Sequence, residues 1–145
     1  MPDRDVEVIR VVAGWIYKAE GDFDNATNEL KRGRRAPVDT VCFHAQQMVE
    51  KYLKAMLVLK NCEVPRTHNV PALLVLLPKA ARPPLTKAEQ ELMSDYAVIT
   101  RYPGDYEPLT VADAREAVAI AKRVRTFLRR YFPILTEEAS PGSTA

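Results

Sequence analysis

The sequence predicts an all-α fold, an antiparallel up-and-down helical bundle of about five helices. Apolar residues recur at spacings of three and four rather than two, which is the repeat of a helix with one buried face. Glycines and prolines interrupt this repeat and divide the chain into segments; they are Gly33, Gly104, Pro37, Pro65, Pro71, Pro83, Pro84, Pro103, Pro108 and Pro133. The composition, 47% hydrophobic and 28% charged, is ordinary for a globular protein. We therefore expect one helical core.

The two longest periodic stretches predict the first two helices. The first helix is expected from about Val6 to Lys31, with Gly14 and Gly21 weakening it slightly. Its predicted buried stripe comprises Val8, Val11, Val12, Trp15, Ala19, Phe23, Ala26 and Leu30. The second helix is expected from about Val38 to Lys60. Its predicted buried stripe comprises Val41, Ala45, Met48, Val49, Tyr52, Met56 and Leu59.

Three shorter helices are expected after them. A helix around Val70–Lys79 can be capped by Thr67 or Asn69, and Pro71 is tolerated in its first turn. The fourth helix should begin at Thr86, where the letters T-K-A-E spell a capping box, and end near Thr100. The fifth should start after Thr110, with Asp113 as cap partner, and run to about Tyr131 before Pro133 stops it. Its predicted buried residues are Ala114, Ala117, Ala121, Val124, Leu128 and Tyr131.

Length and composition bound the organisation of the chain. At 145 residues we expect a single helical domain over residues 1–135, followed by a small, polar and disordered tail at 136–145. No apolar run approaches the roughly 20 residues that cross a bilayer, and the start is not a signal peptide, so we expect a cytoplasmic protein with no membrane association.

Several chemical classes find no support in the sequence. Cys42 and Cys62 form no CxxC pair and have no histidine at ligand spacing, so neither a disulfide framework nor a metal site is expected. The chain lacks GxGxxG, Walker, HExxH and GxSxG elements, and we expect no cofactor. The net charge of +2 does not by itself indicate nucleic-acid binding, although basic residues cluster in the series Lys122, Arg123, Arg125, Arg129 and Arg130.

A polar strip on the second helix is the first candidate site. His44, Gln47, Lys51 and Lys54 recur at intervals of three and four and so project from one strip, with Gln46 and Glu50 on the adjoining one. A merely solvated surface is more often dominated by lysine and glutamate, so His and Gln side chains suggest hydrogen bonding to something other than water. The alternative is that these residues only join helices or subunits through polar contacts.

The turn that follows the fourth helix is the second candidate site. It contains Arg101, Tyr102, Gly104, Asp105 and Tyr106, and a turn held by proline and glycine can fix the guanidinium at the surface of the bundle. Arginine suits bidentate phosphate recognition, and the tyrosines can stack on a base. The alternative is that Arg101 bonds helix carbonyls or Asp105 while the tyrosines only pack.

His68 lies at the start of the third helix, in the letters R-T-H-N. A capping or loop-tethering role is favoured there over catalysis, so His68 ranks below His44 as a catalytic candidate.

Three motifs in order carry a resemblance to a known family. They are C-F-H-A-Q-Q-M-V-E-K-Y-L-K-A from Cys42 to Ala55, P-R-T-H-N-V from Pro65, and R-Y-P-G-D from Arg101. Together they resemble the HEPN family, over about Trp15 to Tyr131. The resemblance implies an antiparallel helical bundle that forms a homodimer. Small prokaryotic members similar to this chain often stand beside a minimal nucleotidyltransferase, in pairs that act or are suspected to act as toxin and antitoxin.

The resemblance also implies a site and shows a departure from it. Many active members are metal-independent RNA endonucleases in which an Arg is followed, four to six residues later, by a His. Arg101 matches the arginine, but no histidine occurs from Tyr102 to Leu109. The implied chemistry, in which His activates the ribose 2′-hydroxyl and Arg stabilises the phosphorane, therefore lacks its base at the expected place.

Three functions remain open from the sequence. The first is a homodimeric binding module for a nucleotidyltransferase partner and for nucleotide or RNA phosphates. It would use Arg101, Lys51, Lys54 and the strip of His44 and Gln47, with contributions from Tyr102 and Asp105. The second is an endoribonuclease in which His44 replaces the missing base, which requires His44 to lie near Arg101. The third is a structural adaptor whose polar strip is consumed in the dimer interface.

Overall fold

The structure is a computed structural model that describes residues 2–97, 104 and 107–132. The described part consists of five α-helices and two 3₁₀ turns, with no strand in these ranges. The α-helices are α1 (Pro2–Leu30), α2 (Val38–Leu59), α3 (Val70–Val75), α4 (Lys87–Asp95) and α5 (Val111–Arg129). The 3₁₀ turns are η1 (Gly33–Arg35) and η2 (Lys79–Ala81). The predicted all-helical bundle is thus confirmed.

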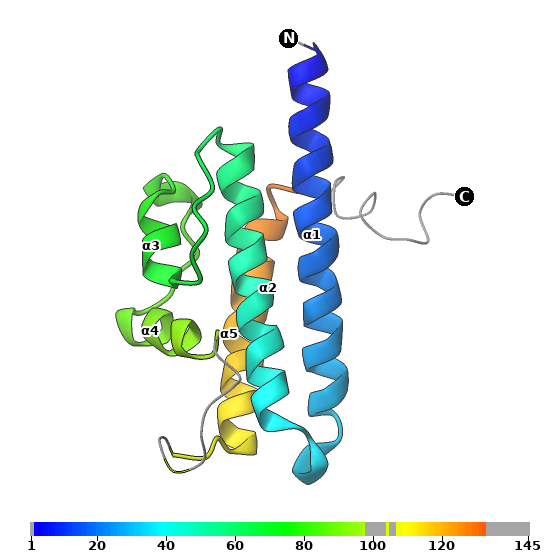
Figure 1. Ribbon diagram of the computed structural model, residues 1–145, viewed down its shortest axis with the longest axis vertical. Helices are drawn as coiled ribbons and strands as arrows, with labels where there is room; N and C mark the ends of the chain where they lie inside the picture. The colour runs from blue at the N-terminus through cyan, green and yellow to red at the C-terminus, as the bar shows by residue number, and fades with distance from the viewer. Residues whose placement is uncertain (1, 98–103, 105–106, 133–145) are drawn as a thin grey trace, which may run out of the picture.

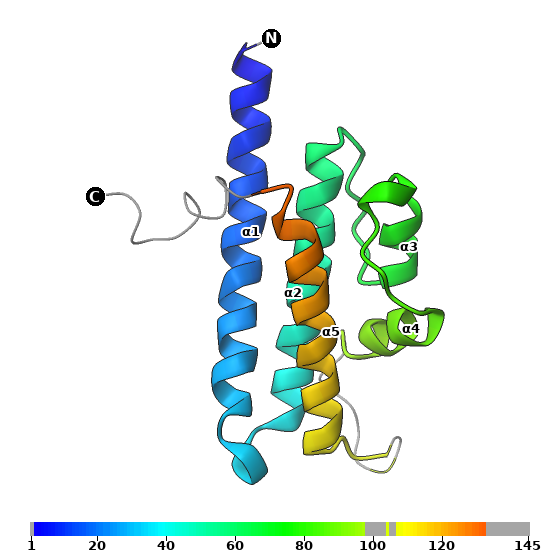
Figure 2. The same cartoon turned by 180° about the vertical axis from the view of Figure 1, so that it is seen from behind.

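Helices α1, α2 and α5 form the body of the bundle (Figures 1 and 2). α1 and α2 run antiparallel along most of their lengths, and α5 packs behind the pair in the view of Figure 1. α3 and α4 lie on the other side of α2 from α1. The chain reverses between α1 and α2 at Gly33, whose φ of +62° is in the left-handed region that glycine adopts without steric cost.

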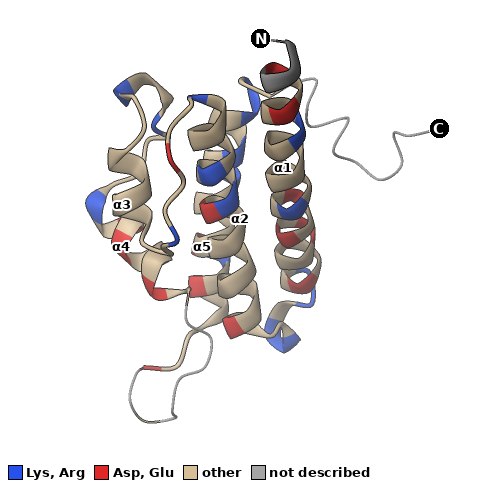
Figure 3. Cartoon of the chain, turned by 45° about the horizontal axis from the view of Figure 1, so that its top comes forward, with Lys and Arg blue, Asp and Glu red and all other residues tan. Residues whose placement is uncertain are grey.

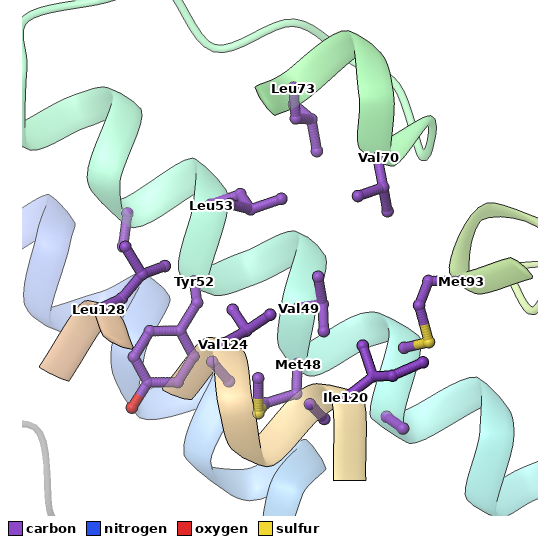
Figure 4. Close-up of a cluster of buried hydrophobic side chains, with 14 of the residues drawn as sticks. Met48, Val49, Tyr52, Leu53, Val70, Leu73, Met93, Ile120, Val124 and Leu128 are labelled. Carbon is purple, nitrogen blue, oxygen red and sulfur yellow. The ribbon is translucent and has the colours of Figure 1, made fainter. Parts of the chain in front are cut away.

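The core is continuous from α1 through α2 to α3, α4 and α5. Figure 4 shows Tyr52 and Met48 of α2 beside Val124 and Leu128 of α5, while Leu53 lies toward α3. Because α2 is packed on nearly every side, most of its residues between Val41 and Leu57 are buried. α2 is therefore the central helix of the bundle, and any polar side chain along it must find partners within the protein.

The helix ends follow the predicted capping chemistry. Thr86 and Glu89 form the capping box of α4, and Thr110 and Asp113 form the corresponding box of α5. At α3 the cap is Asn69, whose side chain accepts a hydrogen bond from the amide of Ala72 at 2.9 Å.

Two predicted helices are shorter than expected. α3 ends at Val75 rather than near Lys79, because Pro78 has no amide hydrogen to continue the ladder and the chain turns into η2 instead. The helical part of α4 ends at Asp95, and Tyr96 and Ala97 form a turn. The predicted end near Thr100, the turn residues Arg101, Tyr102, Asp105 and Tyr106, and the tail at 136–145 lie outside the described residues.

The predicted buried stripe of α1 needs one correction. Val11 is exposed, whereas Ile16, which the stripe omitted, is fully buried. Each residue turns a helix by about 100°, so when Val12 faces α2 its neighbour Val11 must point away. Val6, Ile9 and Tyr17 of α1 are exposed as well, and the first turns of α1 extend beyond the end of α2 (Figure 1).

None of the helices in the described ranges is both long enough and apolar enough to cross a lipid bilayer.

Candidate functional site

The polar face of α2 lies between α1 on one side and α3 with α4 on the other. Charged residues line α1 and α2 on this side of the molecule (Figure 3). Two carboxylates organise the polar side chains here, Asp22 of α1 and Glu50 of α2. The strip predicted from the sequence therefore divides into two neighbouring clusters.

Asp22 joins two of the predicted strip residues. One of its carboxylate oxygens lies 2.8 Å from Nδ1 of His44, and the other accepts a hydrogen bond from Nζ of Lys51 at 2.5 Å. Asp22 itself is only 8% exposed, while the side chains of His44 and Lys51 are 25% and 20% exposed. The imidazole and the ammonium are thus partly exposed, and a buried carboxylate holds both of them.

The contact with Asp22 determines how His44 presents its second ring nitrogen. A carboxylate beside Nδ1 favours the proton on Nδ1, which leaves Nε2 as the basic nitrogen of the neutral ring. Nε2 has no hydrogen-bond partner among the described residues. An imidazole oriented in this way by a carboxylate is suited to accept a proton from a bound ligand.

Glu50 organises the second cluster. It accepts hydrogen bonds from Nε2 of Gln46 and Nζ of Lys54, both at 3.0 Å, and lies 2.6 Å from Nδ1 of His68. Although burial by itself would raise the pKa of Glu50, the bonds from His68, Gln46 and Lys54 hold that pKa below its ordinary value. The predicted loop-tethering role of His68 is confirmed, since its ring ties the loop before α3 to α2.

The remaining strip residues differ in how much of them reaches solvent. Gln47 is partly buried and donates to Oε1 of Gln46 at 2.8 Å. The side chain of Lys54 is only 9% exposed, and its ammonium lies between Glu50 and the ring of Trp15, 5.6 Å from the ring centroid. Lys54 is therefore positioned to hold Glu50 rather than to meet a ligand directly.

A third polar cluster ties α1, α2 and α5 together beneath this face. The hydroxyl of Tyr52 donates to Glu20 at 2.5 Å, and Nε of Arg125 donates to the same carboxylate at 2.9 Å. Burial is the main cause that raises the pKa of Tyr52 far above its ordinary value, and the hydrogen bond to Glu20 is the second cause. Tyr52 is therefore a neutral hydrogen-bond donor in the core.

Cys42 is not a candidate nucleophile. Burial, with a smaller contribution from Asp113, raises the pKa of its thiol to about 12. The reactive thiolate is thus scarcely populated near neutral pH.

Sequence reasoning missed the acidic half of the site. Asp22 and Glu50 hold residues of the predicted strip in place, but only Glu50 was noted from the sequence, and only as a neighbour of the strip. A signal for Asp22 existed, since it lies three residues after Ala19 and four before Ala26, within the apolar stripe of α1. An aspartate at a core position needs hydrogen-bonding partners within the protein, and His44 and Lys51 are those partners.

Arg101, Tyr102 and Asp105 belong to the stretch outside the described residues. Their predicted roles, and the requirement that Arg101 share a cleft with His44, stay predictions.

Fold and site together define an all-helical bundle domain with a carboxylate-oriented histidine on its central helix. Comparison with known families agrees with the resemblance seen in the sequence, since the model described as "HEPN domain" matches residues 12–131. The chain belongs to the HEPN family. This membership supports a nucleotide- or RNA-related module.

One solved structure with a similar fold is the crystal structure of TT1696 from Thermus thermophilus. It is 23% identical, the match covers 82% of this chain and 96% of that chain, and the TM-score is 0.66. At this identity the likeness shows the shared helical fold alone. None of the curated proteins compared with the chain matches it.

Proposed function

We propose that the protein is a homodimeric binding module that recognises phosphate groups of nucleotides or RNA and engages a nucleotidyltransferase partner, in a toxin–antitoxin-like pair. The observation that supports phosphate recognition is the Asp22 cluster, in which one carboxylate holds a partly exposed imidazole and a partly exposed ammonium. The nucleotidyltransferase partner and the paired role follow from the family resemblance.

The cluster leaves donors available for a phosphate. The ammonium of Lys51 has three N–H donors and one is used by Asp22, so two remain. Gln47 also keeps one amide N–H beyond its bond to Gln46. We assign ligand contact to Lys51 and Gln47, with Arg101, Tyr102 and Asp105 as further proposed contacts, and we assign Lys54 to positioning Glu50.

Exposed apolar side chains on α1 support a second copy as partner. Val6, Ile9 and Tyr17 share one helix face and are 55%, 44% and 47% exposed. Apolar side chains gathered on one face commonly mark an interface. A solution mass of twice 16.3 kDa supports the dimer, whereas a monomer at all concentrations contradicts it.

Equilibrium binding of a labelled mononucleotide and of a short RNA, competed with inorganic phosphate, tests the site. Lys51→Ala is expected to weaken binding about tenfold, because a hydrogen bond to a charged group contributes about 1.5 kcal/mol or more. Lys18→Ala, which removes an exposed lysine of α1, is the matched control and should leave affinity unchanged. No measurable affinity for nucleotide, for RNA or for a nucleotidyltransferase encoded beside the protein would count against the module.

The geometry of His44 favours one alternative, a metal-independent endoribonuclease. In that reaction Nε2 of His44 takes the proton of the ribose 2′-hydroxyl and the 2′-oxygen attacks phosphorus. The P–O5′ bond breaks, the 5′-oxygen takes a proton from water, and the products are a 2′,3′-cyclic phosphate and a 5′-hydroxyl. Asp22 would orient the ring and stabilise the imidazolium. Arg101 would stabilise the charge of the phosphorane.

Incubation of the protein with RNA in EDTA, followed by analysis of the RNA ends, tests the alternative. If the protein cleaves, His44→Asn should slow the reaction by about 10²-fold or more, since general base catalysis contributes that much. His68→Asn is the matched control, because His68 is the other histidine of the chain. Cleavage no faster than that of an Arg101→Ala variant would exclude the nuclease.

A further inference from the structure

A groove on the outer side of α5 has no role in the function proposed above. It is shallow and open to solvent, has a volume of about 630 Å³, and lies between α5 and the segment that leads into α4. Its lining residues are Pro84, Ala119, Lys122, Arg123, Thr126, Phe127 and Arg130. α5 is in front of α2 in Figure 2, whereas α2 is in front of α5 in Figure 1. The groove shares no residue with the Asp22 and Glu50 clusters.

Some basic side chains of α5 are bound to carboxylates of the protein, whereas others are exposed and have no such partner in the described part of the chain. Arg125 turns inward to Glu20, and its guanidinium lies 4.7 Å from the ring centroid of Phe23. Arg123 is bound to both carboxylate oxygens of Glu89 at 2.9 Å. Lys122 and Arg130 are exposed and have no carboxylate partner among the described residues. These two cations are therefore free to meet an anion.

The floor of the groove combines an aromatic ring with a stacked guanidinium. Phe127 is partly buried, and the guanidinium of Arg130 lies over its ring at 4.2 Å from the centroid. Pro84 and Ala119 extend the apolar surface beside it. The same guanidinium also lies 5.5 Å from the ring centroid of Tyr131. A planar base can pack against the edge of this cluster and the apolar surface beside it.

The helical spacing makes the groove elongated. Residues 119, 122, 123, 126, 127 and 130 recur at intervals of three and four and so occupy one face over three turns. At 1.5 Å per residue this face is about 16 Å long. A ligand that fills it must itself be extended and must carry negative charge at more than one point along its length.

We propose that this groove binds a single-stranded oligonucleotide, with Lys122, Arg130 and the outer edge of Arg123 on successive phosphates and one base against Phe127 and Arg130. Proteins that bind single-stranded nucleic acids combine a positively charged groove with aromatic side chains on which bases stack, and Lys122, Arg130 and Phe127 supply these groups here. An acidic peptide would satisfy the cations but would leave the stacked floor unused. This groove and the Asp22 cluster are two separate proposed binding sites, so an experiment can exclude binding at one without excluding binding at the other.

Fluorescence anisotropy of a labelled ten-nucleotide oligouridylate, measured over a range of NaCl concentrations, tests the groove. Lys122→Ala and Arg130→Ala are each expected to weaken binding about fivefold or more, and each should lower the slope of log K against log salt by about 0.7. In the double variant, the two fold-losses of affinity should multiply. A labelled ten-residue polyglutamate serves as the second probe and should bind much more weakly than the oligonucleotide.

Two matched variants separate the groove from general charge and from the α2 site. Arg129→Ala removes an exposed arginine of the same helix that does not line the groove, and it should change affinity less than twofold. His44→Asn should leave oligouridylate bound at the groove. Three results would each overturn the proposal. They are a loss of affinity in Arg129→Ala as large as in Lys122→Ala or Arg130→Ala, binding of polyglutamate as tight as that of the oligonucleotide, and unchanged binding in the double variant. Loss of binding only in His44→Asn and Lys51→Ala would place the nucleic acid at the α2 site instead.

Discussion

Glu50→Ala is expected to lower the free energy of unfolding by about 3 kcal/mol or more. The substitution leaves the ammonium of Lys54 and the amide of Gln46 without their acceptor, in a place where both side chains are almost entirely buried. Removing one partner of a buried ion pair costs about 3 to 5 kcal/mol, because the remaining charge is uncompensated. Urea denaturation followed by circular dichroism measures the change.

Two variants make this result specific. Glu91→Ala removes an exposed glutamate of α4 and should change the free energy of unfolding by less than about 0.5 kcal/mol. Glu50→Leu combined with Lys54→Met removes both charges, and it should recover part of the loss because the apolar pair needs no solvation. A Glu50→Ala protein as stable as the parent would show that water replaces the carboxylate at little cost.

The same carboxylate makes stability depend on pH on the acid side. Burial alone would raise the pKa of Glu50, but its hydrogen-bond donors lower it below the ordinary value of 4.5 in the folded protein. A carboxylate with a depressed folded-state pKa contributes stability that is present above its unfolded pKa and is lost as the pH falls through the folded one. We expect the stability of the parent to fall more steeply below about pH 4.5 than that of Glu50→Gln.

Leu53→Ala is expected to lower the free energy of unfolding by about 2 to 5 kcal/mol. Leu53 is fully buried on the side of α2 that faces α3 (Figure 4), so its truncation leaves a cavity between the two helices. Since α3 has only six residues, few side chains are available to hold it against α2. Thermal and urea unfolding give the size of the effect.

Leu76→Ala is the matched control for that truncation. Leu76 follows α3 directly and is 45% exposed, so its loss should cost less than about 1 kcal/mol. A loss of similar size in both variants would mean that the segment around α3 is not held by the buried contact with α2.

Much of the helical architecture could be predicted because its determinants are local. The starts of α2, α4 and α5 and the end of α1 lie within about one residue of their predictions, since apolar spacing, Thr86 and Thr110 act over a few neighbouring residues. The overlong third helix shows the limit of the periodic pattern. The run of apolar residues continues through Leu76 and Leu77, but Pro78 lacks the backbone N–H that would continue the helix, and α3 ends at Val75.

The candidate site could be predicted only in part because its contacts are distant in the chain. His44, Gln47 and Lys51 were visible as a strip because one helix spaces them regularly. Asp22 lies 22 residues before His44, and no local rule connects them. Whether a carboxylate faces an imidazole depends on the rotation of α1 against α2, which apolar packing along both helices determines.

The amino-acid sequence by itself determined the helical class of this protein, the places where most helices begin, and its membership of the HEPN family. Only the tertiary structure decided which charges are available to a ligand. From the sequence, Lys54 looks like a surface cation of the same kind as Lys51, and Arg125 like a surface cation of the same kind as Lys122. Both Lys54 and Arg125 are instead bound to carboxylates within the bundle. The physical reason is that helix formation depends on neighbours in the chain, whereas burial and ion pairing depend on which faces of separate helices meet.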